Sequence, residues 1–109
     1  MKIDFDAIEE QEYPNFKGGE GSMFAKMYVD DSLRVINGRL NPGCSIGMHA
    51  HEGSCETIYI LSGHGTMLYE GNREDMVPGS MSYCPNGHSH SLVNTGSEPL
   101  CFIGVVPTL

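Results

Sequence analysis

Glycine and proline interrupt this chain every few residues, and that punctuation constrains its fold more than any other feature of the sequence. Fourteen glycines and six prolines occur in 109 residues, so few segments are long enough for a stable helix. The segments between the interruptions are short and rich in β-branched or aromatic residues, which favour strands. They are residues 23–29, 33–40, 57–61, 66–69, 89–94 and 100–106. Many short strands at this spacing predict an all-β sandwich or barrel.

The chain has the length of one domain, and nothing in it separates a second. A chain of 109 residues builds a single hydrophobic core. We find no linker, internal repeat or low-complexity tract, so residues 1–109 are predicted to form a single domain. Residues 1–20 are expected to be an N-terminal arm. Within it, residues 1–12 favour either one helical turn or an extended segment, because Pro14 ends any longer helix.

Charge and hydropathy argue against two classes of partner. The chain carries 14 acidic residues against six basic ones, and it has no basic cluster to neutralise a phosphate backbone, so we expect no nucleic-acid partner. No segment approaches the roughly 18 consecutive apolar residues of a membrane span, and the N-terminus lacks the apolar core of a secretory signal. A cytoplasmic location without membrane contact is predicted.

The reducing conditions of the cytoplasm also determine the expected state of the cysteines. Free thiols are predicted for all four: Cys44, Cys55, Cys84 and Cys101.

Two histidines mark the most informative stretch of the sequence. His49 and His51 are two residues apart, so on a strand both side chains point to the same face and one metal ion can bind both. Residues 52–54 favour a turn, which would return Glu56 on a neighbouring strand opposite the pair. His90 begins a later predicted strand and is a candidate fourth ligand. Three imidazoles and one carboxylate suit divalent iron, manganese, nickel, zinc, cobalt or copper.

Around these residues the sequence resembles the two motifs of the cupin family. The first motif, G-x5-H-x-H-x3,4-E-x6-G, is filled by Gly43, His49, His51, Glu56 and Gly63. The second motif, G-x5-P-x-G-x2-H-x3-N, is filled by Gly79, Pro85, Gly87, His90 and Asn94. Every fixed position of both motifs is present, and the resemblance covers residues 43–63 and 79–94 directly.

The resemblance implies a fold and a shared site that the residues alone do not establish. It implies a double-stranded β-helix, or jelly-roll barrel, of about six to eight strands with a metal ion inside one open end. It also implies that His49, His51, Glu56 and His90 bind the same divalent transition-metal ion, whose identity stays open. Small cupins are commonly homodimers, so the resemblance implies a homodimer as well.

Two classes of function agree with these observations. In the first, the protein is a metal-dependent enzyme of the dioxygenase, isomerase or lyase type that acts on a small oxygen-containing molecule. In the second, the metal helps to bind a sugar or an organic acid without turnover. The intact ligand set favours the enzyme. His88 is the candidate catalytic residue if it shares the face of His90, and otherwise it is a residue of the turn after Pro85.

Several side chains have orientations that the sequence does not assign. Arg34 and Arg39 lie on a predicted strand before the metal motif, and either would pair with an anionic substrate if it faced inward. Tyr59, Tyr69 and Tyr83 are expected to contribute mainly to packing.

An apolar stripe beside the histidines is the predicted contact surface of the homodimer. Ile46, Met48 and Ala50 alternate with the histidines and should therefore point away from the metal. This stripe either packs beneath the N-terminal segment of the same chain or contributes to the interface between two copies.

Overall fold

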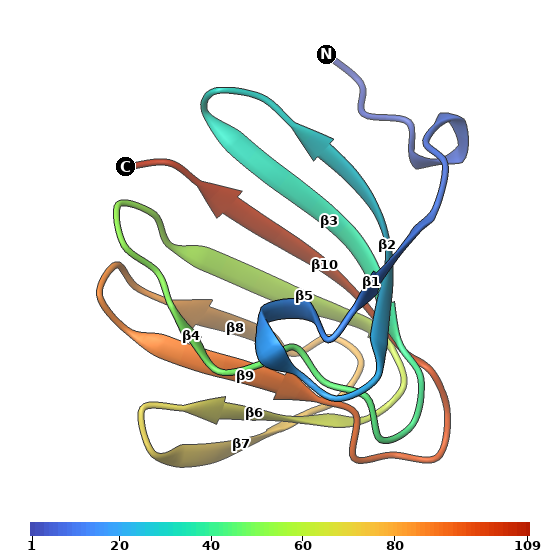
Figure 1. Cartoon of the computed structure of the whole chain (residues 1–109), viewed down its shortest axis with the longest axis vertical. Helices are drawn as coiled ribbons and strands as arrows, with labels where there is room; N and C mark the ends of the chain where they lie inside the picture. The colour runs from blue at the N-terminus through green and yellow to red at the C-terminus, as the bar shows by residue number, and fades with distance from the viewer.

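Ten short strands form two antiparallel sheets in the computed structural model, which describes residues 1–109 (Figure 1). The six-stranded sheet has the order β1 (Gln11–Pro14), β2 (Ser22–Val29), β3 (Leu33–Leu40), β10 (Leu100–Pro107), β5 (Glu56–Ser62) and β8 (Met81–Cys84). The four-stranded sheet has the order β4 (His49–Ala50), β9 (Ser89–Val93), β6 (Gly65–Tyr69) and β7 (Asn72–Met76). Strands far apart in sequence, such as β3 and β10, are neighbours because the chain passes repeatedly between the sheets. This all-β arrangement is the predicted jelly roll.

The six strands predicted from the punctuation are all present with nearly the predicted bounds. Of the other four, β4 falls where the histidine pair predicts a strand, whereas β1, β7 and β8 are not anticipated by the pattern. Strand β7 shows why: Asn72–Met76 is polar and exposed apart from its last residue, and it pairs only with β6 at the edge of the sheet. A solvated edge strand of this kind has neither the alternation nor the apolar composition by which strands are recognised.

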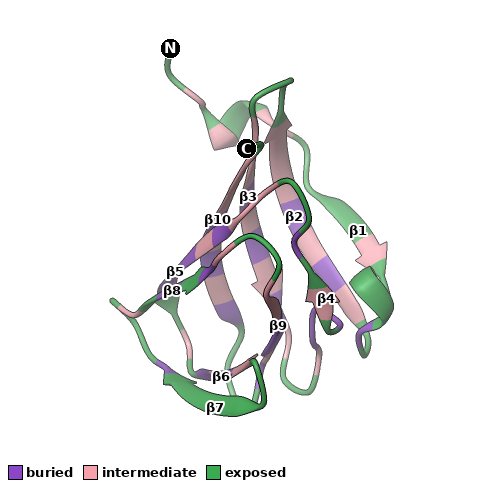
Figure 2. Cartoon of the chain, turned by 90° about the vertical axis from the view of Figure 1, so that its left-hand side faces the viewer, coloured by how far each residue is buried: buried purple, intermediate pink, exposed green.

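Apolar side chains fill one end of the space between the sheets. Leu40, Ile60 and Phe102 of one sheet and Met67 of the other are all almost completely buried. Figure 2 shows the buried segments along the middle strands, while β7 is exposed along most of its length. Gly38 lies against the ring of Phe102, where even an added methyl group would clash. The burial of these large side chains contributes most of the folding free energy.

The N-terminal segment leads into the six-stranded sheet. A single 3-10 turn spans Phe5–Ala7, and a second spans Phe16–Gly18. Between them, β1 pairs with β2, from Gln11 opposite Ala25 to Pro14 opposite Ser22, so residues 11–14 of the predicted arm extend the sheet at its edge. No helix in the protein is long and apolar enough to span a membrane.

The predicted outer stripe of Ile46, Met48 and Ala50 does not form as a unit. Ile46 is buried in the core, whereas Met48 and Ala50 are exposed. The prediction fails because β4 contains only His49–Ala50, and the preceding residues follow an irregular path in which alternation has no meaning. The backbone N–H of Ile46 donates to the carbonyl oxygen of Leu92 in β9, and its side chain belongs to the core.

Candidate metal centre

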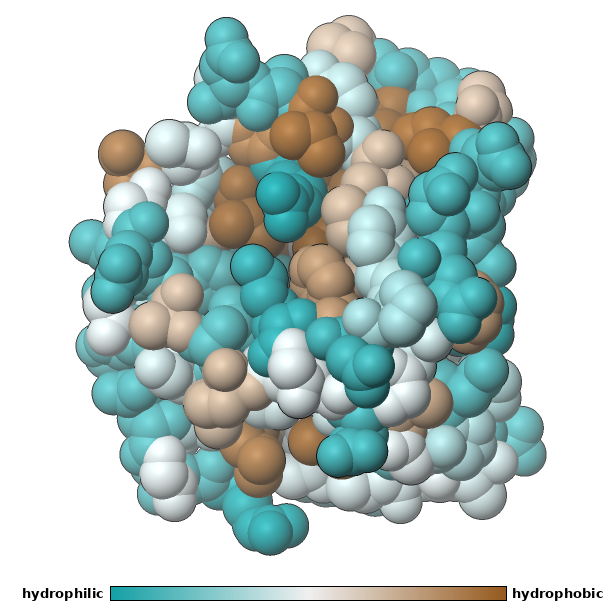
Figure 3. All heavy atoms as spheres, in the orientation of Figure 1, coloured by the Kyte–Doolittle hydropathy of each residue, from teal (hydrophilic) through white to brown (hydrophobic).

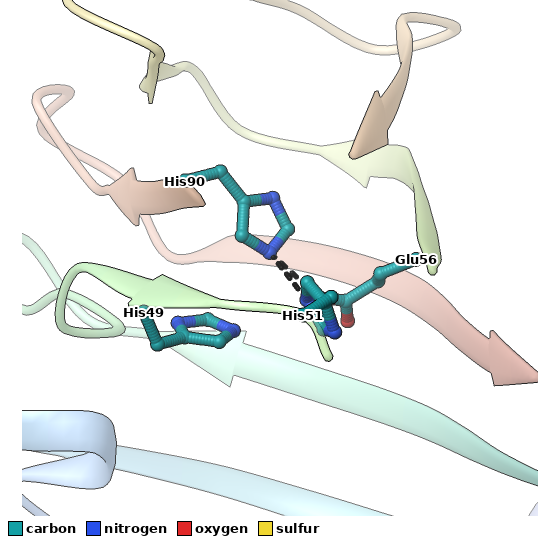
Figure 4. A group of neighbouring side chains, drawn as sticks. All are labelled: His49, His51, Glu56 and His90. Carbon is teal, nitrogen blue, oxygen red and sulfur yellow. Dashed lines mark hydrogen bonds and ion pairs between the residues drawn. The ribbon is translucent and has the colours of Figure 1, made fainter. Parts of the chain in front are cut away.

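Four side chains from both sheets converge between the sheets, as Figure 4 shows. His49 on β4 lies directly opposite His90 on β9, and His51 follows one residue after β4. Glu56 is the first residue of β5 in the other sheet. The turn after His51, with Gly53 at a φ of 72°, therefore carries the chain across to the facing sheet. The prediction that Glu56 returns on a strand next to the histidine pair is wrong, although its carboxylate does reach them.

The donor atoms of this cluster are close enough to share one ion. Glu56 Oε1 lies 2.9 Å from His90 Nε2 and 3.1 Å from His51 Nε2, and the two imidazole nitrogens are 2.9 Å apart. The ligand atoms of all four residues lie within 4.8 Å of one another. Neighbouring ligands of a six-coordinate ion at about 2.1 Å are separated by about 3 Å, and the donor atoms of His51, Glu56 and His90 have this spacing.

A hydrogen bond fixes the tautomer of His49 in a form that suits metal binding. The Nδ1 of His49 lies 2.8 Å from the carbonyl oxygen of Gly47, which can only accept, so Nδ1 carries the proton and Nε2 keeps a free lone pair. The Nδ1 of His51 contacts the hydroxyl of Ser54 at 3.2 Å. Burial also lowers the pKa of His49, which favours the neutral imidazole that a metal needs.

Glu56 is held as a carboxylate at the base of the cluster. Its burial would raise the pKa, but hydrogen bonds with His51 and His90 lower the pKa to about 2. Gly104 on β10 leaves the space that Glu56 occupies, because an added Cβ would lie 3.0 Å from Glu56 Oε2. The anionic form is the one that offsets the charge of a divalent cation.

His90 supplies a further test of whether an ion fits. Its side chain is almost completely buried, and its Nδ1 has no hydrogen-bond partner. His90 Nε2 and His51 Nε2 face each other, and two facing imidazole nitrogens share at most one proton between them. A buried lone pair without a partner is costly, and a cation shared by His90 Nε2, His51 Nε2 and Glu56 Oε1 would satisfy these converging atoms, although it would not reach Nδ1. The residues present are therefore consistent with one metal ion.

A cavity of about 400 Å³ opens beside the cluster. Three of the four cluster residues, His49, His51 and Glu56, contribute to its wall, and only His49 among the four is less than fully buried. On the face drawn in Figure 3, apolar residues gather over the start of β3 and the end of β10, where the lining residues Leu33 and Val106 lie. An ion in the cluster would thus be reached from this cavity.

The structure shows on which face of β3 each of the two arginines lies, which the sequence does not determine. Arg34 lines the cavity, because it lies on the same face of β3 as the buried residues Ile36 and Gly38. Arg39 points to the opposite face, where its guanidinium forms an ion pair with Glu10 at 3.1 Å and lies 4.5 Å above the ring of Phe24. Only Arg34 is positioned to meet a ligand in the cavity.

The histidine and tyrosines that the sequence singled out outside the metal motif positions do not line the cavity. His88 forms a hydrogen bond through Nδ1 with the hydroxyl of Tyr69 and stacks on its ring, and it is not among the lining residues. Its catalytic role stays a prediction. Tyr59 and Tyr83 are exposed on the outer face of the six-stranded sheet.

The four cysteines are free, as predicted. Cys84 is completely buried, and burial raises the pKa of its thiol to about 11, so it behaves as an apolar side chain. The cavity is also lined by Lys17, Asp30, Ser54 and Thr108. No sequence pattern indicates them, because all four lie outside the strands, in turns or near the end of the chain.

A model of the cupin domain matches residues 38–106, which is more than half of the chain. The chain belongs to the cupin family. Along almost its whole length this cupin is similar to an oxalate-binding protein of Thermotoga maritima, with 31% identity over 112 residues covering 97% of this chain and 93% of the relative. It is also similar to a glucose-6-phosphate isomerase of Thermococcus onnurineus, with 39% identity, but that match covers 54% of this chain and 34% of the isomerase.

Solved structures agree with this assignment. The structure of a predicted oxalate decarboxylase from Thermotoga maritima superposes on this cupin with a TM-score of 0.89, 29% identity and full coverage of both chains. A sugar phosphate isomerase from Silicibacter pomeroyi superposes with a TM-score of 0.79 at 23% identity, covering all of this chain and 76% of the isomerase, and shows the shared fold alone. The double-stranded β-helix fold predicted from the two motifs is confirmed.

Proposed function

We propose that this cupin binds a small carboxylate anion of the oxalate type through one divalent metal ion held by His49, His51, Glu56 and His90. The observation that carries the proposal is the convergence of these four donors at the wall of a cavity of about 400 Å³. A metal ion bound there supplies an electrophile for carboxylate oxygens. The relative that matches over nearly the full chain is an oxalate-binding protein, which supports the same ligand class here.

The charge distribution of the cavity also supports an anionic ligand. The protein is acidic overall, yet two of its six basic residues, Lys17 and Arg34, line this one cavity. Three acidic residues also line it: Glu56 belongs to the cluster, Asp30 accepts hydrogen bonds from the backbone N–H groups of Ser32 and Leu33, and Glu52 is exposed. Lys17 and Arg34 are therefore the positive groups to which an anion in the cavity can bind.

Elemental analysis and calorimetry test this proposal together. The purified protein should contain about one transition-metal ion per chain, and titration with oxalate should give saturable binding. Protein stripped of metal with a chelator should lose that binding, and reloading should restore it. His64→Ala is the matched control, because His64 is exposed and contacts Asp75 outside the cavity. A metal-loaded protein that gives no binding heat with oxalate would contradict the proposal.

Turnover is the second candidate function. It is favoured by the partial exposure of His49, which leaves the cluster accessible from the cavity. The cavity lining contains neither a tyrosine nor His88, so it holds none of the acid–base candidates named from the sequence. Incubation of the metal-loaded protein with oxalate, followed by measurement of carbon dioxide, formate and dioxygen, separates the two functions. Product formation that disappears after chelation would establish an enzyme.

We also propose that the protein forms a homodimer through an outer patch made by Tyr59 and Leu61 of β5 and Met81 and Tyr83 of β8. Met81 and Tyr83 are 63% and 60% exposed, and they lie on the edge strand of the six-stranded sheet. Tyr59 lies opposite Met81 on the neighbouring strand, so the patch is continuous. None of its residues is charged in a chain with a net charge of -8, so the patch itself adds no like-charge repulsion between two copies.

Sedimentation velocity tests the dimer and its location. We expect a dimer at tens of micromolar for the wild type and a shift toward monomer for Tyr83→Glu, because a buried charge at an apolar contact is unfavourable. Met48→Glu is the control, because Met48 is also exposed and apolar but lies outside the outer patch. Dissociation by Met48→Glu with no effect of Tyr83→Glu would instead place the interface beside the histidines.

A further inference from the structure

We infer that Arg34 determines the specificity of the cavity for dicarboxylates, by receiving the carboxylate that is remote from the metal cluster. This inference rests on the proposed function and adds to it a second anchoring point within the same cavity. Arg34 lies on β3, and the cluster residue Glu56 lies on β5, with β10 between the two strands.

Arg34 has no partner within the protein. Its Nε is buried without a hydrogen bond, and its guanidinium takes part in none of the ion pairs of the chain. Arg39, five residues farther along β3 and on the opposite face, is by contrast paired with Glu10 and Asn41. A guanidinium that is partly withdrawn from water and unpaired is unfavourable, so its position is best accounted for by an anion that enters the cavity.

The neighbouring acidic group does not fill this role. Asp30 lines the same cavity, but its Oδ1 accepts from the backbone N–H groups of Ser32 and Leu33, and its Oδ2 accepts from the hydroxyl of Tyr28. These hydrogen bonds hold Asp30 in the turn between β2 and β3, and Arg34 forms no ion pair with Asp30 or with Glu52, the other acidic lining residue outside the cluster.

Register places Arg34 across from the metal cluster. Arg34 lies opposite Val106 on β10, and the residue before it on β10, Val105, lies opposite Thr57 on β5. Arg34, Val106 and Glu56 are therefore in line across three neighbouring strands, and all three line the cavity. Strands are about 4.8 Å apart, so the backbones of Arg34 and Glu56 are about 10 Å apart, a gap that two side chains and a small ligand fill.

A ligand in this gap meets a positive group at each end. The planar guanidinium binds a carboxylate through two parallel hydrogen bonds, which a lysine cannot reproduce. A dicarboxylate satisfies both the cluster and Arg34, whereas a monocarboxylate with a hydroxyl in place of the second carboxylate satisfies only the cluster. Oxalate and glycolate form such a matched pair of probes.

Calorimetric titration of metal-loaded Arg34→Met with both probes tests the inference. We expect oxalate affinity to fall about 10- to 100-fold, because a charge-assisted pair is lost, and glycolate affinity to change less than about 3-fold. Arg34→Lys should give an intermediate loss for oxalate. Arg39→Gln, on the opposite face, is the control and should leave both affinities unchanged. Metal content should equal that of the wild type in all three variants.

Thermal unfolding without ligand gives an independent measure. Because Arg34 has no partner to lose, Arg34→Met should unfold at the same temperature as the wild type or higher. Oxalate affinity of Arg34→Met within 2-fold of the wild type would overturn the inference, as would a marked loss of thermal stability, which would indicate a structural role. If the wild type itself does not bind oxalate, the proposed function fails first, and that outcome is distinct from a wild type that binds without help from Arg34.

Discussion

The two ends of the space between the sheets differ in composition and in what they do. At one end, Leu40, Ile60, Met67 and Phe102 form a filled apolar core. At the other end, polar and charged side chains surround a cavity of about 400 Å³ beside the metal-ligand cluster. The same strands supply both ends: β3 contributes Leu40 to the core and Arg34 to the cavity.

On the same strands, the residues of the filled end determine the stability of the fold, and the residues of the open end are those that can bind a ligand. Side chains at the filled end are closely packed, so changes there remove burial and leave cavities. Side chains at the open end include buried polar groups with incomplete hydrogen bonding, such as His90 and Arg34. Such groups contribute little to folding, so they can be replaced with smaller losses of stability than the core residues. Substitutions at the two ends should therefore have separable effects.

Truncation of the core should have the largest effect. Phe102→Ala removes a completely buried ring, so we expect a loss of about 3–5 kcal/mol in the free energy of unfolding. Chemical denaturation followed by circular dichroism measures it. Because this loss is comparable with the total stability of a small domain, the variant should be partly unfolded at 37 °C. A loss below about 1 kcal/mol would show that the filled end is not the main source of stability.

Removal of a histidine should abolish metal binding while the fold remains. His49→Ala and His90→Ala each delete one of the converging donors, so we expect metal affinity to fall at least about 100-fold with little change in the far-ultraviolet circular dichroism spectrum. Elemental analysis after dialysis measures the loss, with His64→Ala as the control. Full metal content in either variant would remove that residue from the site.

Replacement of the carboxylate by its neutral amide should weaken metal binding less than loss of a histidine. Glu56→Gln keeps the shape of the side chain but removes the charge that offsets the cation, so affinity should fall about 10- to 100-fold. Competition with a metal-sensitive dye gives the dissociation constant. Unchanged affinity would indicate that the carboxylate does not bind the ion.

His88→Ala should have the smallest effect. Its ring is stacked on Tyr69 and does not line the cavity, so we expect metal content to be unchanged and oxalate affinity to change less than about 2-fold. Calorimetric titration with oxalate, under the same conditions as for the wild type, measures the change in affinity. If the protein proves to be an enzyme and His88→Ala lowers its rate 10-fold or more, the catalytic role predicted from the sequence would be established instead.

Much of the fold follows from local signals, and the errors have identifiable causes. Glycine and proline bound the apolar segments, so the six principal strands are predictable one by one. Strand β7 escapes prediction because an exposed edge strand needs no apolar residue. The prediction that Ile46 points outward is wrong because the alternation of side chains does not continue beyond the two residues of β4.

The sequence by itself determined the ligand types, their spacing and the family, because each motif depends on residues whose order along the chain is fixed. It could not determine the face of Arg34. Both faces of β3 carry apolar residues, Leu33 and Val35 on one and Ile36 and Leu40 on the other, so alternation favours neither. Only the pairing of β3 with β10, and the packing of one sheet face against the other, decided that Arg34 points into the cavity with the metal-ligand cluster while Arg39 points to the opposite face and pairs with Glu10. The physical reason is that a side chain's surroundings depend on which segments, distant in sequence, bury its face of the strand.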